Sequence, residues 1–185
     1  MKEEKWKLWL RNKNILEKDF KIYMKKKLII KTAISSILAS SHLEKAFHNL
    51  DLSSFIFENQ ANINKRTGSE NYNDSVMVFA YYAMYHAALA MLFTQGYKSK
   101  SHTATICFLC KECEELDEKD IEKISMAIER KNIEEIGEGQ QRREKASYQS
   151  SISFNAELAK MTLDDARDFV TKIYSILTIK KDDKK

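Results

Sequence analysis

A long uncharged stretch constrains the fold of this chain more than any other feature. Residues 76–93 read VMVFAYYAMYHAALAMLF and contain no Asp, Glu, Lys or Arg. Asn73 or Asp74 is placed to cap a helix at its start, and Gly96 is placed to end that helix in a left-handed conformation. A helix that is apolar on every side is usually buried on every side. We therefore predict that residues 76–93 form the central helix of a bundle.

The side chains of this helix fall into two stripes at about 100° per residue. The small stripe consists of Ala80, Ala83, Ala87 and Ala90. The bulky stripe, roughly opposite, consists of Val78, Tyr81, Tyr82, Tyr85, Leu89 and Leu92. We expect one neighbouring helix to approach the alanines closely and other helices to pack against the bulky side chains.

A membrane span is the alternative interpretation of the same stretch. Its length is near the lower limit for crossing a bilayer, which takes roughly 17–25 apolar residues. However, three tyrosines and a histidine lie inside it, and the mean hydropathy of the chain is −0.50. We therefore expect a buried core helix and no membrane partner.

The composition favours an all-α domain. The chain has four glycines and no proline, whereas the many turns of a β-sandwich need both residues. Hydrophobic residues make up 43% of the chain and charged residues 31%, which is typical of a helical protein with a proper core. We predict an antiparallel up-down bundle of four to five helices with an N-terminal helical extension. No signal peptide is visible and three cysteines give no disulfide framework, so we expect a cytoplasmic location.

The expected organisation is a basic helical extension over residues 1–27, a bundle over 28–178 and a charged tail over 179–185. Before the central helix, we expect one helix over residues 3–24 and a second over 28–50, which bends at its serines and adds another turn or two up to residue 60. After the central helix, we expect a helix over 102–114, with Ser101 or Thr103 as its cap. Two more helices are expected, one from Asp117 onward and one from just after Thr162. Loops are expected over residues 59–73 and from Gly137 to about residue 146. Trp6 and Trp9 need a surface to cover, so we expect the first helix to pack on the body or on another chain.

The positive charge of the chain is concentrated at its N-terminus. Residues 1–31 hold eleven Lys/Arg and four Asp/Glu, a net charge of +7, while the remainder holds 20 and 23, a net charge of −3. Such an arm suggests an anionic partner, of which RNA is the obvious one. A solubilising, partly frayed terminus is the alternative explanation.

Two segments carry a recognisable order of residues. Residues 80–102, AYYAMYHAALAMLFTQGYKSKSH, contain a tyrosine pair, a histidine, a glycine stop and a second histidine, and residues 142–148 read RREKASY. Together with HLEKAF at 42–47, these segments resemble the HEPN domains (higher eukaryotes and prokaryotes nucleotide-binding) over about residues 28–178. The resemblance implies a helical bundle that usually forms a homodimer. It also implies a role beside a minimal nucleotidyltransferase, in toxin–antitoxin-like pairs or in RNA cleavage.

The resemblance also implies site residues. The family's recurrent positions fall on Tyr82, Tyr85, His86, His102, Arg143 and Tyr148, and with Lys100 these are our candidates for binding a nucleotide or RNA. Ser147 stands where the family usually has an acidic residue. Ribonuclease members carry an arginine followed four to six residues later by a histidine, and no arginine of this chain is so followed. We therefore assign no catalytic residue and expect no cofactor.

Each candidate also has a structural explanation. His86 can act as an acid, a base or a ligand, or it can be a hydrogen-bonded core residue. Lys98, Lys100 and His102 can meet a phosphate, or they can offset the negative end of the preceding helix. A second cluster of basic and aromatic residues consists of Arg142, Arg143, Lys145 and Tyr148. Because arginine can hold phosphate and stack on a base, this cluster is a candidate phosphate site. The alternative is that its basic residues form structural ion pairs with neighbouring glutamates.

The three cysteines lie at three-residue spacing in CFLCKEC. Cys107, Cys110 and Cys113 spread over about 120° of a helix, and His102 is a conceivable fourth zinc ligand. An iron–sulfur run would need a fourth cysteine, which the chain lacks. We expect small apolar core residues and no metal.

Three functional hypotheses follow. The first is a non-catalytic HEPN-type subunit that binds a nucleotide or RNA and acts with a minimal nucleotidyltransferase. The second is a metal-independent ribonuclease that uses His86 or His102 for proton transfer and Arg143 on the phosphate. The third is a protein-interaction module without a nucleotide role.

Overall fold

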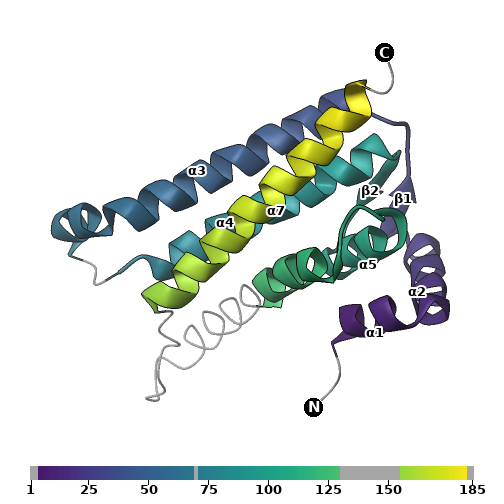
Figure 1. The fold of residues 1–185 in the computed structure, drawn as a ribbon, viewed down its shortest axis with the longest axis horizontal. Helices are drawn as coiled ribbons and strands as arrows, with labels where there is room; N and C mark the ends of the chain where they lie inside the picture. The colour runs from purple at the N-terminus through teal and green to yellow at the C-terminus, as the bar shows by residue number, and fades with distance from the viewer. Residues whose placement is uncertain (1–3, 69–70, 130–154, 183–185) are drawn as a thin grey trace.

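The structure, a computed structural model, describes residues 4–68, 71–129 and 155–182 (Figure 1). It confirms the predicted all-α class, with one short two-stranded ladder in the described part of the chain. The elements in chain order are α1 (Lys5–Arg11), α2 (Lys13–Lys25), β1 (Ile29–Lys31), α3 (Ser36–Thr67), α4 (Asn73–Thr94), β2 (Tyr97–Ser99), α5 (His102–Glu112) and α7 (Ala156–Asp182). Residues 118–129, between α5 and α7, are also helical.

Helix α4 is the central helix, as predicted. It packs mainly against α3 and α7, which lie alongside it in Figure 1. The four residues of the alanine stripe are fully buried. Helix α4 is long and apolar enough to cross a membrane, but 61% of its most apolar 18-residue stretch is buried inside the structure. It is therefore the core helix of the bundle.

The ends of α4 are only partly as predicted. Gly96 adopts φ +76° just after the helix, which confirms the left-handed stop. At the other end the cap position is Tyr72, whose side chain makes no capping bond, so the prediction of Asn73 or Asp74 is wrong. Asn73 is instead the first helical residue, and its side-chain oxygen accepts a hydrogen bond of 2.9 Å from Gln60 on α3.

Helix α3 is much longer than the sequence indicated. It runs without interruption from Ser36, one residue after its cap Ser35, to Thr67, so the expected loop over residues 59–73 is wrong for most of its length. The polar residues near its end lack a hydrophobic period, but Gln60 is held by the start of α4. Tertiary contact thus extends a helix that local propensity does not favour.

The residues expected to begin that helix form a strand instead. β1 pairs with β2 in an antiparallel ladder that joins Ile29 to Ser99 and Lys31 to Tyr97. Gly96 makes the ladder possible, because a Cβ atom there would lie 2.9 Å from the backbone oxygen of Thr32. The Thr32 N–H donates 2.8 Å to the oxygen of Gly96, which fixes the two segments together.

The N-terminal extension is two short helices, where the sequence predicted one. Asn12 separates the two helices and caps α2. Its side chain accepts hydrogen bonds of 3.1 Å from the N–H groups of Asn14 and Ile15. Trp6 and Trp9 are buried, which confirms that these helices pack on the body. Phe20 of α2 lies 6.4 Å from Phe108 of α5, centroid to centroid.

The C-terminal side of the bundle is formed by α7 and residues 118–129. The predicted cap Asp117 accepts a hydrogen bond from the Asp120 N–H at 3.1 Å. α7 begins at Ala156, earlier than the predicted start after Thr162, because Asn155 accepts a bond of 2.8 Å from the Leu158 N–H and serves as its cap. The side chains of α7 that face the core share one stripe of the helix and are buried: Leu163, Ala166, Phe169, Val170, Ile173 and Leu177.

Candidate functional site

A continuous band of aromatic and imidazole rings follows one side of α4. Tyr81 is fully buried, whereas Tyr82, Tyr85 and His86 are half-buried. Neighbouring ring centroids along it are 4.9 Å apart for Tyr81 and Tyr82, and 6.5 Å for Tyr82 and His86. We use the name aromatic band for these rings and the three that extend them from α3, α5 and the end of α4: His42, Tyr81, Tyr82, Tyr85, His86, Phe93 and His102.

One end of the aromatic band is built by the start of α5. The ladder and the turn at Gly96 bring the chain back to α4, so that His102 opens α5 beside it. The Tyr81 hydroxyl and the His102 Nε2 atom form a hydrogen bond of 2.7 Å. The Tyr85 ring lies edge-on to His102, with centroids 4.7 Å apart. His102 is therefore oriented by two tyrosines of the central helix.

The other end of the band is built by α3. The Nδ1 atoms of His42 and His86 lie 3.0 Å apart in a hydrogen bond, so one ring donates and the other accepts. His42 also stacks on Phe93, with a centroid distance of 5.2 Å and an interplanar angle of 13°. Burial, the neighbouring His86 and Lys45 lower the pKa of His42 from 6.5 to about 4. Burial and Lys45 also lower the pKa of His86. Both imidazoles are therefore neutral at pH 7.

The comparison with protein families identifies the fold around this band. A family model described as the HEPN domain matches residues 39–181, which is most of the chain and contains every residue of the aromatic band. The chain belongs to the HEPN domain family. Its match begins inside α3, so α1, α2 and β1 lie before the matched segment.

One similar protein adds to this assignment. The chain is 38% identical to a UPF0332 protein of Archaeoglobus fulgidus over 96 residues. The matched segment covers 50% of this chain and 66% of that relative, just under two thirds of its length. The HEPN assignment supports a helical domain whose function is related to nucleotides or RNA.

The structure places the predicted site residues of this HEPN domain in three groups. Tyr82, Tyr85, His86 and His102 lie together in the aromatic band. Lys100 is exposed at the end of the ladder, two residues before His102. Arg143 and Tyr148 lie outside the described residues, as do Arg142 and Lys145.

Sequence reasoning missed His42 as a member of the site. It lies in the segment HLEKAF that supported the resemblance, but only the packing of α3 on α4 brings it to His86. A signal was present, because His42 stands on the helix expected to pack beside the central one. The sequence alone could not tell which face of α3 meets α4.

The three cysteines lie on α5 and at its C-terminal cap, and they pack against the core. Cys107 and Cys113 are buried and Cys110 is half-buried. Burial raises the pKa of the Cys107 thiol, and it raises the pKa of Cys110 to about 12, so neither is a thiolate at pH 7. Among the described residues, no three His, Cys, Asp or Glu side chains are grouped closely enough to hold a metal ion.

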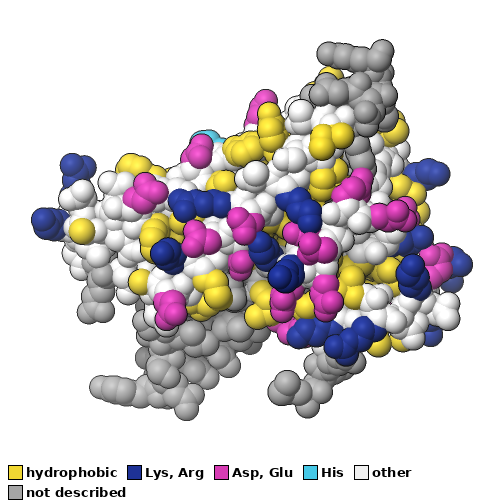
Figure 2. Space-filling model, viewed as in Figure 1, with side chains coloured by type: hydrophobic (Ala, Val, Ile, Leu, Met, Phe, Trp, Pro, Cys, Tyr) yellow, Lys and Arg dark blue, Asp and Glu magenta, His cyan; other side chains and the backbone are white. Residues whose placement is uncertain are grey.

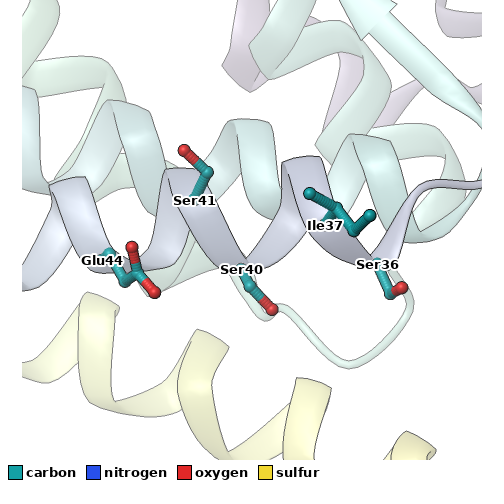
Figure 3. A pocket seen from close by; sticks show the side chains of 5 residues that line it. All are labelled: Ser36, Ile37, Ser40, Ser41 and Glu44. Atoms are coloured by element: carbon teal, nitrogen blue, oxygen red, sulfur yellow. The ribbon is translucent and has the colours of Figure 1, made fainter.

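Two open hollows lie on the surface of the described residues. The first, of about 440 Å³, is lined by Ser36, Ile37, Ser40, Ser41 and Glu44 of α3 (Figure 3). The second, of about 400 Å³, is lined by Gln95 and three glutamates, which would repel a phosphate. Neither hollow contains a residue of the aromatic band, so the band is a surface formed by rings.

The band can stack and accept protons better than it can donate them. Aromatic and imidazole faces suit nucleobases, which stack with little dependence on sequence. A neutral imidazole can also accept a hydrogen bond or a proton. General-acid catalysis needs the protonated ring, and the lowered pKa values of His42 and His86 make that form of these two rings rare at neutral pH. His42 and His86 are therefore better suited to accept a proton than to donate one.

Proposed function

We propose that this chain is a non-catalytic HEPN-type subunit that binds a nucleotide or a base of RNA on its aromatic band. The observation that carries the proposal is the unbroken row of rings from His102 through Tyr85 and His86 to His42. Stacking on such a ring contributes about 1–3 kcal/mol per base in proteins that bind single strands. The HEPN assignment supports the same class of ligand.

The proposal extends to partners. The protein forms a homodimer and acts with a minimal nucleotidyltransferase, in a toxin–antitoxin-like pair. Resemblance to the HEPN family supports both statements, and the half-exposed apolar side of α4 supports the first. Co-expression with a minimal nucleotidyltransferase encoded by a neighbouring gene tests the pairing, and separate elution of the two proteins on size exclusion would contradict it.

Titration calorimetry with mononucleotides and a short RNA tests the binding surface. Tyr82→Ala removes a half-buried ring from the middle of the band and should weaken binding about 5- to 150-fold, the equivalent of one stacked base. Tyr82→Phe keeps the ring and should bind like wild type. Tyr174→Ala, which removes an exposed tyrosine of α7, is the matched control.

Three outcomes of that titration would decide against the proposal. They are no heat with any nucleotide or RNA, equal binding by wild type and Tyr82→Ala, and equal loss in Tyr174→Ala. The first outcome would favour the protein-interaction module. Cleavage of the RNA during the titration would favour the ribonuclease.

A further inference from the structure

The ladder brings together lysines from two segments that lie far apart in the chain. Residues 25–31 contribute Lys25, Lys26, Lys27 and Lys31, and residues 97–100 contribute Lys98 and Lys100. All six side chains are exposed, and neither segment contains an acidic residue. We use the name lysine ridge for these six residues. Figure 2 shows Lys and Arg side chains, with Asp and Glu side chains among them, along the right-hand edge of the molecule, where Figure 1 places α2 and β1.

The backbone holds these lysines in a defined arrangement. Lys98 lies opposite Ile30 in the antiparallel ladder, and the Lys100 N–H donates 2.9 Å to the oxygen of Leu28. Lys98 is the middle residue of β2 and Lys100 follows its last residue, so alternation places these two on one face of the ladder, whereas Lys31, which pairs with Tyr97, lies on the other face. Lys27 adopts φ +54° and turns the chain from α2 directly into β1.

The charge of the ridge is not compensated within the described part of the chain. None of its six ammonium groups lies within ion-pair distance of a described carboxylate, whereas Lys7, Lys111, Lys123 and Lys172 all do. Solvated lysines in one place produce a positive potential that attracts a polyanion. The ridge therefore has the electrostatic character of a surface for a phosphate backbone.

The position of the ridge identifies RNA as the polyanion. Lys100 is two residues before His102, so the ridge adjoins one end of the aromatic band. No large hydrophobic side chain is exposed within residues 25–31 or 97–100, whereas Ile22 and Ile34 just outside them are exposed, so anionic vesicles serve as the competing ligand in the test. We propose that the lysine ridge docks the backbone of an RNA strand whose bases reach the aromatic band. This inference rests on the proposed function for the placing of the bases, and it names a polymer as the ligand.

The test is the salt dependence of RNA binding by the full-length chain. Fluorescence anisotropy with a labelled 20-nucleotide single-stranded RNA between 50 and 300 mM KCl gives the slope of log K against log salt. Loss of two phosphate contacts in the ridge variant Lys98→Gln/Lys100→Gln should reduce this slope by about 1.4, at about 0.7 per contact, and lower the affinity at least about tenfold at low salt. A circular dichroism melt checks that the variant folds, and Lys98→Gln alone should produce about half of that change in slope.

A matched control removes the same charge elsewhere. Lys65→Gln/Lys119→Gln replaces two exposed lysines away from the ridge and should leave the slope unchanged. Wild-type affinity and slope in the ridge variant, or an equal loss in the control, would overturn the proposal. The proposal would also be overturned if wild type bound phosphatidylserine vesicles and the ridge variant lost this binding but still bound RNA.

Failure of the ridge can be distinguished from failure of the band. Tyr82→Ala should weaken mononucleotide and RNA binding without changing the salt slope, because no cation is removed. The ridge variant should change the salt slope for RNA and leave mononucleotide binding within about twofold. If Tyr82→Ala has no effect but the ridge variant does, the proposed function fails and backbone docking stands.

Discussion

His42 and His86 face one another across α3 and α4 with their Nδ1 atoms 3.0 Å apart. Each ring is half-buried, and the pKa of His42 is lowered to about 4 from 6.5. Since the folded-state pKa is lower than the unfolded value, the unfolded chain binds the proton first as the pH falls. The pair therefore favours the folded state above about pH 6.5, and that advantage is lost between pH 6.5 and pH 4.

His42→Gln should flatten this part of the stability profile. Between pH 7 and pH 4.5 the unfolding free energy should fall by about 1–2 kcal/mol less in the variant than in wild type. This value is reduced to allow for the partial exposure of the rings. Urea melts at the two pH values measure it. His48→Gln, at an exposed position on the same helix, is the control, and identical profiles for wild type and His42→Gln would contradict the assignment.

Leu92→Ala should be strongly destabilising because Leu92 is fully buried in α4. Removing a buried leucine costs about 2–5 kcal/mol through lost transfer energy and the cavity left behind. Ile179→Ala removes a side chain of α7 that is 62% exposed, and its effect should stay within about 0.5 kcal/mol. A loss below about 1 kcal/mol for Leu92→Ala in denaturant melts would show that α4 is not the central helix.

Lys27→Gly should stabilise the protein. Lys27 has φ +54° and ends α2 in a left-handed turn, with hydrogen bonds from its own N–H to Met24 and from the Leu28 N–H to Tyr23. A side chain in this conformation costs roughly 1–2 kcal/mol, while glycine loses about 0.5–1 kcal/mol of unfolded-state entropy, so the net gain should be about 0.5–1 kcal/mol. Thermal melts decide the sign, and a lowered midpoint would contradict the reasoning.

The central helix was predictable from the sequence because its signal is local. Eighteen residues without a charge, followed by Gly96, allow few structures other than a buried helix. The start of α7 was missed because its cap Asn155 precedes the apolar stripe by two turns. The tail of α3 was missed because Gln60 is stabilised by Asn73, a contact that depends on the α3–α4 hairpin.

The site was predictable only where it lies on one helix. Tyr82, Tyr85 and His86 share a face of α4 by their spacing alone. His42 joins them through the packing of two helices, and the lysine ridge joins residues 25–31 to residues 97–100 through a ladder of three residue pairs. The sequence predicts Ile29 and Ile30 to begin a helix, because strand pairing with a distant segment leaves no local pattern.

The protein should be a dimer in solution. Ile37 and Leu38, at 79% and 45% exposure, form an exposed apolar surface at the start of α3, and Val78 and Phe79 are half-exposed on α4. Exposed apolar surface of this kind is typical of a protein–protein contact. Sedimentation at micromolar concentration should give twice the chain mass of 21.6 kDa.

A charge on this surface should dissociate the dimer. Leu38→Glu buries a carboxylate in the contact and should shift the protein to the monomer. Ile179→Glu changes a side chain of α7 that is 62% exposed, and it should leave the dimer intact. A wild-type particle of 21.6 kDa would contradict the dimer, and loss of the dimer in Ile179→Glu would place the contact elsewhere.

The isolated protein should not cleave RNA. Cleavage without a metal needs a base for the 2′-hydroxyl proton, an acid for the leaving oxygen and a cation on the phosphate, and proton transfer alone contributes typically 10²–10⁴-fold. With a pKa of about 4, His42 is protonated in only about one molecule in a thousand at pH 7. The decisive assay compares wild type with His86→Ala, His102→Ala and Arg143→Ala on a labelled RNA at pH 7 and pH 5. We expect no turnover in any of them, and wild-type turnover that one substitution abolishes would replace the binding subunit with a ribonuclease.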